Sequence, residues 1–324
     1  MNRRTILKCL AALCMFLAYQ AFAQDQKYPV KPVRIIVPLA PGGATDLNAR
    51  IIAEELGKRL KEQFVVENRP GAGGTIGTEA VARAAPDGYT LLAVSTTNMV
   101  ISNQLYKVRY NTLRDFAPVA LTTKAANLIV VHPSLPVKSV SELVRLAKSR
   151  PGQLFYSSSG SGTNVHLAME MFKTATGTNI VHVPHKGGDT SVMSVLTGET
   201  QIAIQVVSRL LSLVETGKLR AIAVTSDKRS HLLPNVPTVM ESGVPGYEAS
   251  LWGGLVAPAG TPEFIIQRLA TNIAGMLQDA AVREKITLDG SEVWSLGPQE
   301  FATFAKAEYA RWGKAIRDSG AKVE

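Results

Sequence analysis

Three times along this sequence, a short apolar strand pattern runs into a loop rich in glycine, serine or threonine, and helical spacing follows at once. The loops are Ala40–Asp46, Ser157–Asn164 and Pro184–Asp189, and a further polar strand end lies at Ser95–Asn98. Strands that alternate with helices usually pair in parallel, with the helices covering both faces of the sheet. The pattern therefore predicts an α/β fold of mainly parallel sheets flanked by helices.

The remaining elements follow from apolar periodicity. Thr45 or Asp46 is expected to cap one helix and Ser139 another, because short polar side chains accept hydrogen bonds from first-turn amides. An apolar stripe on the last helix is expected to pack in the core. Strands are expected at 33–38, 64–67, 90–94, 128–131, 154–156, 180–183, 202–206, 220–224 and 252–257, helices at 47–60, 75–85, 140–149, 165–174, 190–197, 262–277 and 298–319, and the stripe at Phe301, Phe304, Tyr309, Trp312 and Ile316.

The first 23 residues have the three-part pattern of a secretory signal peptide. Arg3, Arg4 and Lys8 precede the apolar run Cys9–Ala18, and Ala21-Phe22-Ala23 is a small-x-small cleavage site. A membrane anchor is the alternative, but the run is shorter than the ~20 residues that cross a bilayer. Arg3-Arg4 also resembles a twin-arginine signal, so the export route stays open. The pattern predicts export to the periplasm with cleavage after Ala23, and both cysteines leave with the leader.

Charge and composition exclude several classes of protein. The chain has 35 basic and 26 acidic residues among 324, a net charge of +9 that falls to +6 when three basic and no acidic residues leave with the leader. No run of five basic residues occurs, whereas nucleic-acid binding needs a clustered patch. The 46% hydrophobic content excludes a disordered chain. A mild positive field suits a small anionic ligand.

The glycine loops are suited to bind a carboxylate. In parallel sheets, ligands bind outside the carboxyl ends of the strands. Helix N-termini present free backbone amides and the positive end of the helix dipole there, and glycine lets the backbone approach the ligand. Two such loops facing one another would hold a carboxylate with almost no charged side chain. The simpler interpretation is that the loops are only strand-to-helix turns.

The sequence gives little support for catalysis, a metal or a cofactor. A serine hydrolase using Ser161 or Ser159 is the enzyme alternative, but Gly160-Ser161-Gly162 does not match the nucleophile elbow. No glycine run has the spacing of a nucleotide-binding fingerprint. His166 and Glu170 share a helix face, but a zinc site needs three or four ligands. The candidate bases are His166, His182 and His185.

A set of motifs resembles the solute-binding proteins of tripartite tricarboxylate transporters, the Bug family, over essentially the whole mature chain. The motifs lie at 28–38, 41–50, 66–74, 86–92, 115–119, 166–170, 182–187, 219–225, 234–238 and 252–262, among them Pro41-Gly42-Gly43-x-x-Asp46, Val66-Glu67-Asn68-Arg69-Pro70-Gly71-Ala72-Gly73-Gly74, Pro86-Asp87-Gly88-Tyr89-Thr90 and Trp252-x-Gly254-Leu255-x-Ala257-Pro258.

The resemblance implies a two-lobed, type II-like periplasmic binding protein. It would be a monomer without cofactor or catalytic activity that closes on a small carboxylated ligand and delivers it to membrane transporter subunits. A sensor on the same fold is the remaining alternative. Lobe 1 would comprise 24–124 plus 250–324 and lobe 2 would comprise 125–249, with the two crossovers as hinge.

The resemblance also implies the ligand contacts, which are backbone amides and hydroxyls of facing loops. Lobe 1 would supply Ala40, Gly42, Gly43, Ala44, Thr45 and Asp46, with Ser95 and Thr96 at the neighbouring strand end. Lobe 2 would supply Ser158, Ser159, Gly160, Gly162, Thr163 and Asn164. The chain departs from the family pattern at His185 and Gln205, which would make a neutral or pH-sensitive polar contact with the distal end of the ligand.

Overall fold

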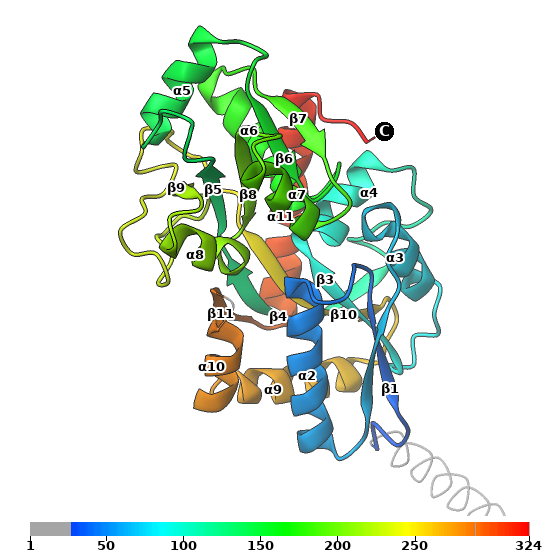
Figure 1. The fold of residues 1–324 in the computed structure, drawn as a ribbon. Coiled ribbons are helices and arrows are strands. Elements are labelled where there is room, and N and C mark those ends of the chain that lie inside the picture. Colours follow the sequence, from blue (N-terminus) through cyan, green and yellow to red (C-terminus); the bar gives the residue numbers. More distant parts are fainter. Residues whose placement is uncertain (1–26, 289, 324) are drawn as a thin grey trace, which may run out of the picture.

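The computed structural model describes residues 27–288 and 290–323, and these form two sheets, each flanked by helices (Figure 1). The predicted signal peptide and its cysteines lie outside the described residues. In the part of the chain described, no helix combines the length and apolarity that crossing a membrane requires. We call the sheet that contains the N-terminal strand, with its helices, lobe 1 and the other sheet, with its helices, lobe 2.

The elements of lobe 1 come from both ends of the chain. The strands are β1 (Val33–Val37), β2 (Phe64–Asn68), β3 (Thr90–Ser95), β4 (Phe116–Ala125), β10 (Leu251–Pro258) and β11 (Ser291–Leu296). The helices are α2 (Ala44–Leu60), α3 (Thr75–Ala82), α4 (Ser102–Leu105), α9 (Glu263–Met276), α10 (Ala280–Thr287) and α11 (Pro298–Ser319), with short turns η1 (Ala72–Gly74) and η2 (Thr97–Ile101).

Lobe 2 is formed by the middle of the chain. Its strands are β5 (Asn127–Val131), β6 (Phe155–Ser158), β7 (Val181–Pro184), β8 (Ile202–Val206) and β9 (Arg220–Val224). Its helices are α5 (Val140–Ser149), α6 (Asn164–Thr176), α7 (Gly188–Leu196) and α8 (Val207–Glu215). The chain enters this sheet between β4 and β5 and returns to the first sheet between β9 and β10.

Both sheets are mixed, which corrects the expectation of mainly parallel sheets. The strand order is β11-β4-β10-β3-β1-β2 in the first and β7-β6-β8-β5-β9 in the second. Parallel pairing is confined to β1 with β2 and β3, and to β6 with β7 and β8. β10 runs antiparallel to β3 and β4, and β5 runs antiparallel to β8 and β9. β11 also runs antiparallel to β4, and β5 and β10 are the strands that follow the two crossovers between the sheets.

The core explains how the lobes are held together. Successive residues of β1 point to opposite faces, so that Ile36 joins one buried cluster and Ile35 joins another. The cluster with Ile36 continues from the first sheet into the second through Trp252 and Trp312, both at most 2% exposed. Trp312 lies on α11, which runs through the junction of the lobes (Figure 1). The predicted stripe on this helix is therefore core packing, with Phe301 and Trp312 fully buried.

Candidate functional site

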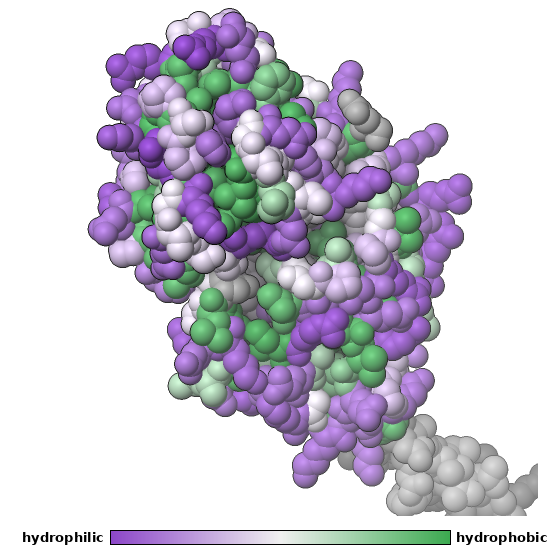
Figure 2. Space-filling model, in the orientation of Figure 1, coloured by the Kyte–Doolittle hydropathy of each residue, from purple (hydrophilic) through white to green (hydrophobic). Residues whose placement is uncertain are grey.

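Two cavities open between the lobes and meet at the first turn of α2 (Figure 2). We call one of them the loop cavity, with a volume of about 460 Å³, and the other the apolar cavity, with a volume of about 580 Å³. The loop cavity is lined by Leu39, Ala40, Pro41, Gly43, Ala44, Thr45, Ser95, Thr97, Asn127, Ser159, Thr163, Asn164, Val165, Lys186, Gly187, Gly188, Asp189, Thr190, Gln205, Val206, Arg209 and Leu251.

Two helix N-termini meet at the loop cavity from opposite lobes. α2 follows Gly43 and α7 follows Gly187, and no side chain caps either helix. Gly187 has φ 114°, a conformation that side chains with a Cβ rarely adopt. First-turn amides have no partner within their own helix, and the helix dipole places partial positive charge there. The loop cavity is therefore suited to an anion.

Two buried amide side chains line the same cavity with unsatisfied polar atoms. Gln205, at the end of β8, is 4% exposed, and its Nε2 has no hydrogen-bond partner in the described structure. Asn127, at the start of β5, is fully buried, and its Oδ1 likewise has none. Leaving a buried polar atom unpaired costs about 1–3 kcal/mol. A polar ligand in the loop cavity would remove this cost.

The N-terminus of α6 differs from those of α2 and α7, because its polar groups are already bonded within the protein. The Thr163 hydroxyl accepts a hydrogen bond from the His166 amide at 3.4 Å and donates to the Gly160 carbonyl at 2.7 Å. The Asn164 amide donates to Thr97 Oγ1 at 3.2 Å, and its side chain donates to the Ser250 carbonyl at 3.3 Å. The two Asn164 bonds join the α6 loop to lobe 1 and to the returning chain.

Asp46 organises the first loop from behind. Its carboxylate accepts the Gly42 amide at 2.9 Å, Arg50 at 3.0 and 3.1 Å and the Asn68 amide at 2.9 Å. Burial acts to raise the pKa of Asp46, but the hydrogen bonds from Arg50, Gly42 and Asn68 outweigh it and lower the pKa. The predicted cap at Thr45 or Asp46 was wrong, since Gly43 is the capping position. The carboxylate reaches back to Gly42 and leaves the first-turn amides uncapped. The cap predicted at Ser139 is confirmed, because its side chain accepts from the Glu142 amide.

The structure brings most of the predicted site residues into the loop cavity. Those that line it are Ala40, Gly43, Ala44, Thr45, Ser95, Ser159, Thr163, Asn164 and Gln205, whereas Gly42 lines the apolar cavity. Asp46, Thr96, Ser158, Gly160, Gly162 and His185 line neither. Thr96 instead accepts a hydrogen bond from the Trp252 amide at 3.0 Å. The His185 side chain is partly buried, and its Nε2 has no partner among the described residues.

Sequence reasoning missed several lining residues. Asn127 is the polar first residue of an otherwise apolar strand, and that contrast was the signal available. Arg209 comes from α8, a helix that the periodicity analysis did not predict, and it pairs with Asp189. Lys186 lies in the third loop and makes no ion pair in the described structure.

Three aromatic rings stack behind the α6 loop. His182 lies between Tyr156 at 4.8 Å and His166 at 4.1 Å, measured between ring centroids. Ser158 Oγ lies 2.6 Å from His182 Nε2, and His166 Nδ1 accepts the Gly162 amide at 3.1 Å. Burial lowers the pKa of His166 to about 4 and that of His182 to about 3. Both histidines are therefore neutral at pH 7 and fix the shape of the loop.

This arrangement does not match the hydrolase alternative. Of the three candidate bases, His182 bonds to a serine, but that serine is the fully buried Ser158, and neither Ser159 nor Ser161 bonds to a histidine in the described structure. Among residues 27–288 and 290–323, no acid is hydrogen-bonded to the other ring nitrogen of His182, as a catalytic triad would require. Among the described residues, no group of three or more metal-ligating side chains is placed to hold a metal ion.

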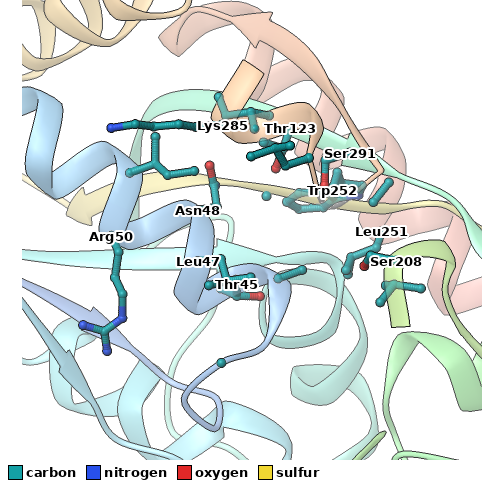
Figure 3. A pocket seen from close by; sticks show the side chains of 18 of the residues that line it. Thr45, Leu47, Asn48, Arg50, Thr123, Ser208, Leu251, Trp252, Lys285 and Ser291 are labelled. Atoms are coloured by element: carbon teal, nitrogen blue, oxygen red, sulfur yellow. The ribbon is translucent and has the colours of Figure 1, made fainter. Parts of the chain in front are cut away.

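The apolar cavity lies on the other side of the first turn of α2, between α2, α8 and α10 (Figure 3). It is lined by Gly42, Ala44, Thr45, Leu47, Asn48, Arg50, Ile51, Glu54, Thr123, Ala125, Val206, Ser208, Arg209, Leu251, Trp252, Gly253, Lys285, Ile286, Leu288 and Ser291. Sequence reasoning did not predict this cavity, because it placed neither α8 nor α10.

The chain matches a family model and curated relatives over most of its length. Residues 48–321 match the model described as tripartite tricarboxylate transporter family receptor. The chain is 35% identical to protein BugT of Bordetella pertussis over 322 residues, which cover 98% of this chain and 99% of BugT.

Solved structures show the same fold. A structure described as R. palustris Rpa4515 with adipate is 36% identical, with a TM-score of 0.84, and covers 92% of this chain and 100% of that one. MatC from Rhodopseudomonas palustris with bound malate is 30% identical, with a TM-score of 0.80, over 89% of this chain and 100% of that one. The periplasmic binding protein BugD is 32% identical, with a TM-score of 0.78, over 92% and 100%. The two-lobed α/β fold class predicted from the sequence is confirmed.

Proposed function

The chain belongs to the tripartite tricarboxylate transporter receptor family of periplasmic binding proteins, and from this premise we propose that it captures a small carboxylate between its lobes and delivers it to membrane transporter subunits. The family consists of solute-binding receptors rather than enzymes. Relatives of known structure hold adipate and malate, which are both carboxylates.

One observation carries the proposal for the ligand. The uncapped N-termini of α2 and α7 face one cavity from opposite lobes, and the buried Gln205 offers an unpartnered Nε2 in the same cavity. Backbone amides, helix dipoles and an amide N–H all favour a negatively charged oxygen ligand. Because the groups come from both lobes, a carboxylate bound there would favour lobe closure.

We place the hinge at the two crossovers, with lobe 1 as residues 24–124 plus 250–324 and lobe 2 as residues 125–249. The segment that would be cleaved after Ala23 lies outside the described residues, so export by this signal peptide belongs to the proposal. N-terminal sequencing of the protein recovered from a periplasmic extract tests it. An N-terminus at Gln24 is expected, and retention of residues 1–23 would contradict it.

Ligand binding is tested by thermal unfolding of the protein, dialysed into carboxylate-free buffer, against mono-, di- and tricarboxylates and aromatic acids. A ligand at 100 times its Kd stabilises the protein by about 2.7 kcal/mol, which raises Tm by several degrees. Gln205→Leu should weaken the active carboxylate about 10- to 100-fold, because it removes a hydrogen bond to a charged group worth about 1.5–3 kcal/mol. No shift with any carboxylate would overturn the proposal.

Two glycine variants provide a matched comparison. Gly43 and Gly297 both occupy helix N-cap positions, with φ −81° and −72°, and a Cβ at either would come no closer than 3.7 Å to atoms beyond the adjacent residues. Gly43→Val adds bulk beside the first-turn amides of α2 and should abolish the ligand-induced shift. Gly297→Val makes the same change at the start of α11, outside both cavities, and should keep it.

Delivery to a transporter needs a separate test. Growth on the identified carboxylate as sole carbon source, in cells lacking this protein, should be restored by the wild type and not by Gly43→Val. Growth restored equally by the wild type and by Gly43→Val would show that transport does not depend on the loop cavity.

A further inference from the structure

The apolar cavity is lined by hydrocarbon from three elements. Leu47 and Ile51 lie one turn apart on α2, Ile286 and Leu288 lie at the end of α10, and Leu251 and Trp252 belong to β10. Leu47 is 42% exposed and Leu288 is 74% exposed. Large apolar side chains left open inside a concave surface indicate a site for an apolar ligand group.

The charged side chains of this cavity are all paired within the protein. Arg50 bonds to Asp46, and Figure 3 shows it extending away from the other labelled side chains. Lys285 pairs with Glu54 at 3.0 Å. Arg209 pairs with Asp189. The Asn48 amide is likewise satisfied by the Thr122 hydroxyl at 2.9 Å. The apolar cavity thus offers no free charge to a second carboxylate.

The two cavities are adjacent and share part of their walls. Ala44, Thr45, Val206, Arg209 and Leu251 line both. A molecule whose head lies at the uncapped first turn of α2 can therefore extend past Leu251 into the apolar cavity. The polar and apolar halves of such a molecule would each meet a matching surface.

We propose that the ligand is a monocarboxylate with an extended hydrocarbon tail, its head in the loop cavity and its tail between α2 and α10. The proposal rests on the proposed function, because it takes the carboxylate site of the loop cavity as given. It differs from the ligands held by the solved relatives, since adipate and malate each carry two carboxylates. A second carboxylate would have to enter a cavity of hydrocarbon and paired charges, which is costly.

A chain-length series tests the proposal directly. Calorimetric titration with straight-chain monocarboxylates from propionate to dodecanoate should give affinities that rise by up to about fourfold per added methylene until the cavity is filled. The α,ω-dicarboxylates of the same length should bind at least tenfold more weakly than the long monocarboxylates. In Leu47→Asn and Leu288→Asn, the gain in affinity per added methylene should fall below twofold.

Leu113→Asn is the matched control, because Leu113 is 41% exposed and lines neither cavity. It should keep the wild-type gain per methylene. Monocarboxylate affinities that do not change with chain length, or dicarboxylates that bind as tightly, would overturn this inference and leave carboxylate capture standing. The absence of binding by every acid in both series would overturn the proposed function itself.

Discussion

The stacked histidines behind the α6 loop make stability depend on pH in a defined window. Burial lowers the pKa of His166 to about 4, with Lys173 adding to the effect. Burial also lowers the pKa of His182 to about 3, with His166 as the next contribution. Both lie far below the ordinary value of about 6.5, which applies in the unfolded chain. We therefore consider how the stability of the protein changes when the pH is lowered from 7.5 to 5.

The sign and size follow from proton linkage. Between pH 6.5 and about 4 the unfolded chain binds more protons than the folded one. The free energy of unfolding is therefore unaffected by these histidines above pH 6.5 and decreases as the pH falls below it. At pH 5, protonation of each histidine stabilises the unfolded chain by about 2 kcal/mol, so the two histidines together lower the free energy of unfolding by about 4 kcal/mol. Carboxylates with lowered pKa, such as Asp46 and Glu308, lose their contribution only near and below pH 4.5.

Urea unfolding at pH 7.5, 6.0 and 5.0 measures this loss. The wild type should lose about 4 kcal/mol between the first and last condition, with an unchanged m-value. His182→Gln removes one titrating group, so its loss should be about half. His231→Gln, at an exposed histidine, should behave like the wild type. Stability that is constant over this range, or an undiminished loss in His182→Gln, would refute the argument that the buried pair is responsible.

Three substitutions test the packing around the site by urea or thermal unfolding. Glu308→Ala removes one of the two carboxylates that pair with the half-buried Arg311 and leaves two buried indole N–H donors without an acceptor, so it should cost about 3–5 kcal/mol, with Glu308→Gln milder. Equal effects of the two substitutions would contradict a charge-based explanation. Thr163→Ala removes the α6 cap and should cost about 1 kcal/mol, and no loss would mean that water replaces the cap. Gly254→Ala would place a Cβ 2.3 Å from the Ala120 carbonyl oxygen and should cost about 1–3 kcal/mol or more, so a wild-type Tm would contradict the close strand approach.

Local pattern explains why much of the fold could be predicted. β8, β9, α5 and α11 begin and end at the predicted residues, because apolar periodicity and caps are encoded within each segment. β4 was not predicted: its interior Pro118 argues against a strand, and the structure accommodates it beside a register shift against β10. The local apolar pattern also could not predict strand direction, because whether β10 runs parallel or antiparallel to its neighbours depends on residues far away in the chain.

The three glycine-rich loops look alike in sequence, and the structure separates them by what their polar groups already contact. Thr163 forms its hydrogen bonds within the loop, where it caps α6, and Asn164 forms bonds to Thr97 and Ser250 at the junction between the lobes. The α6 loop therefore joins the lobes. In the first loop, Asp46 turns back to Gly42 and leaves the α2 terminus uncapped. Caps and cross-lobe bonds depend on side-chain direction, which spacing does not determine. The residues available to a ligand are therefore those with polar atoms that have no partner in the described structure. Gln205 is one of them, and the sequence identified it only as a departure from a family pattern.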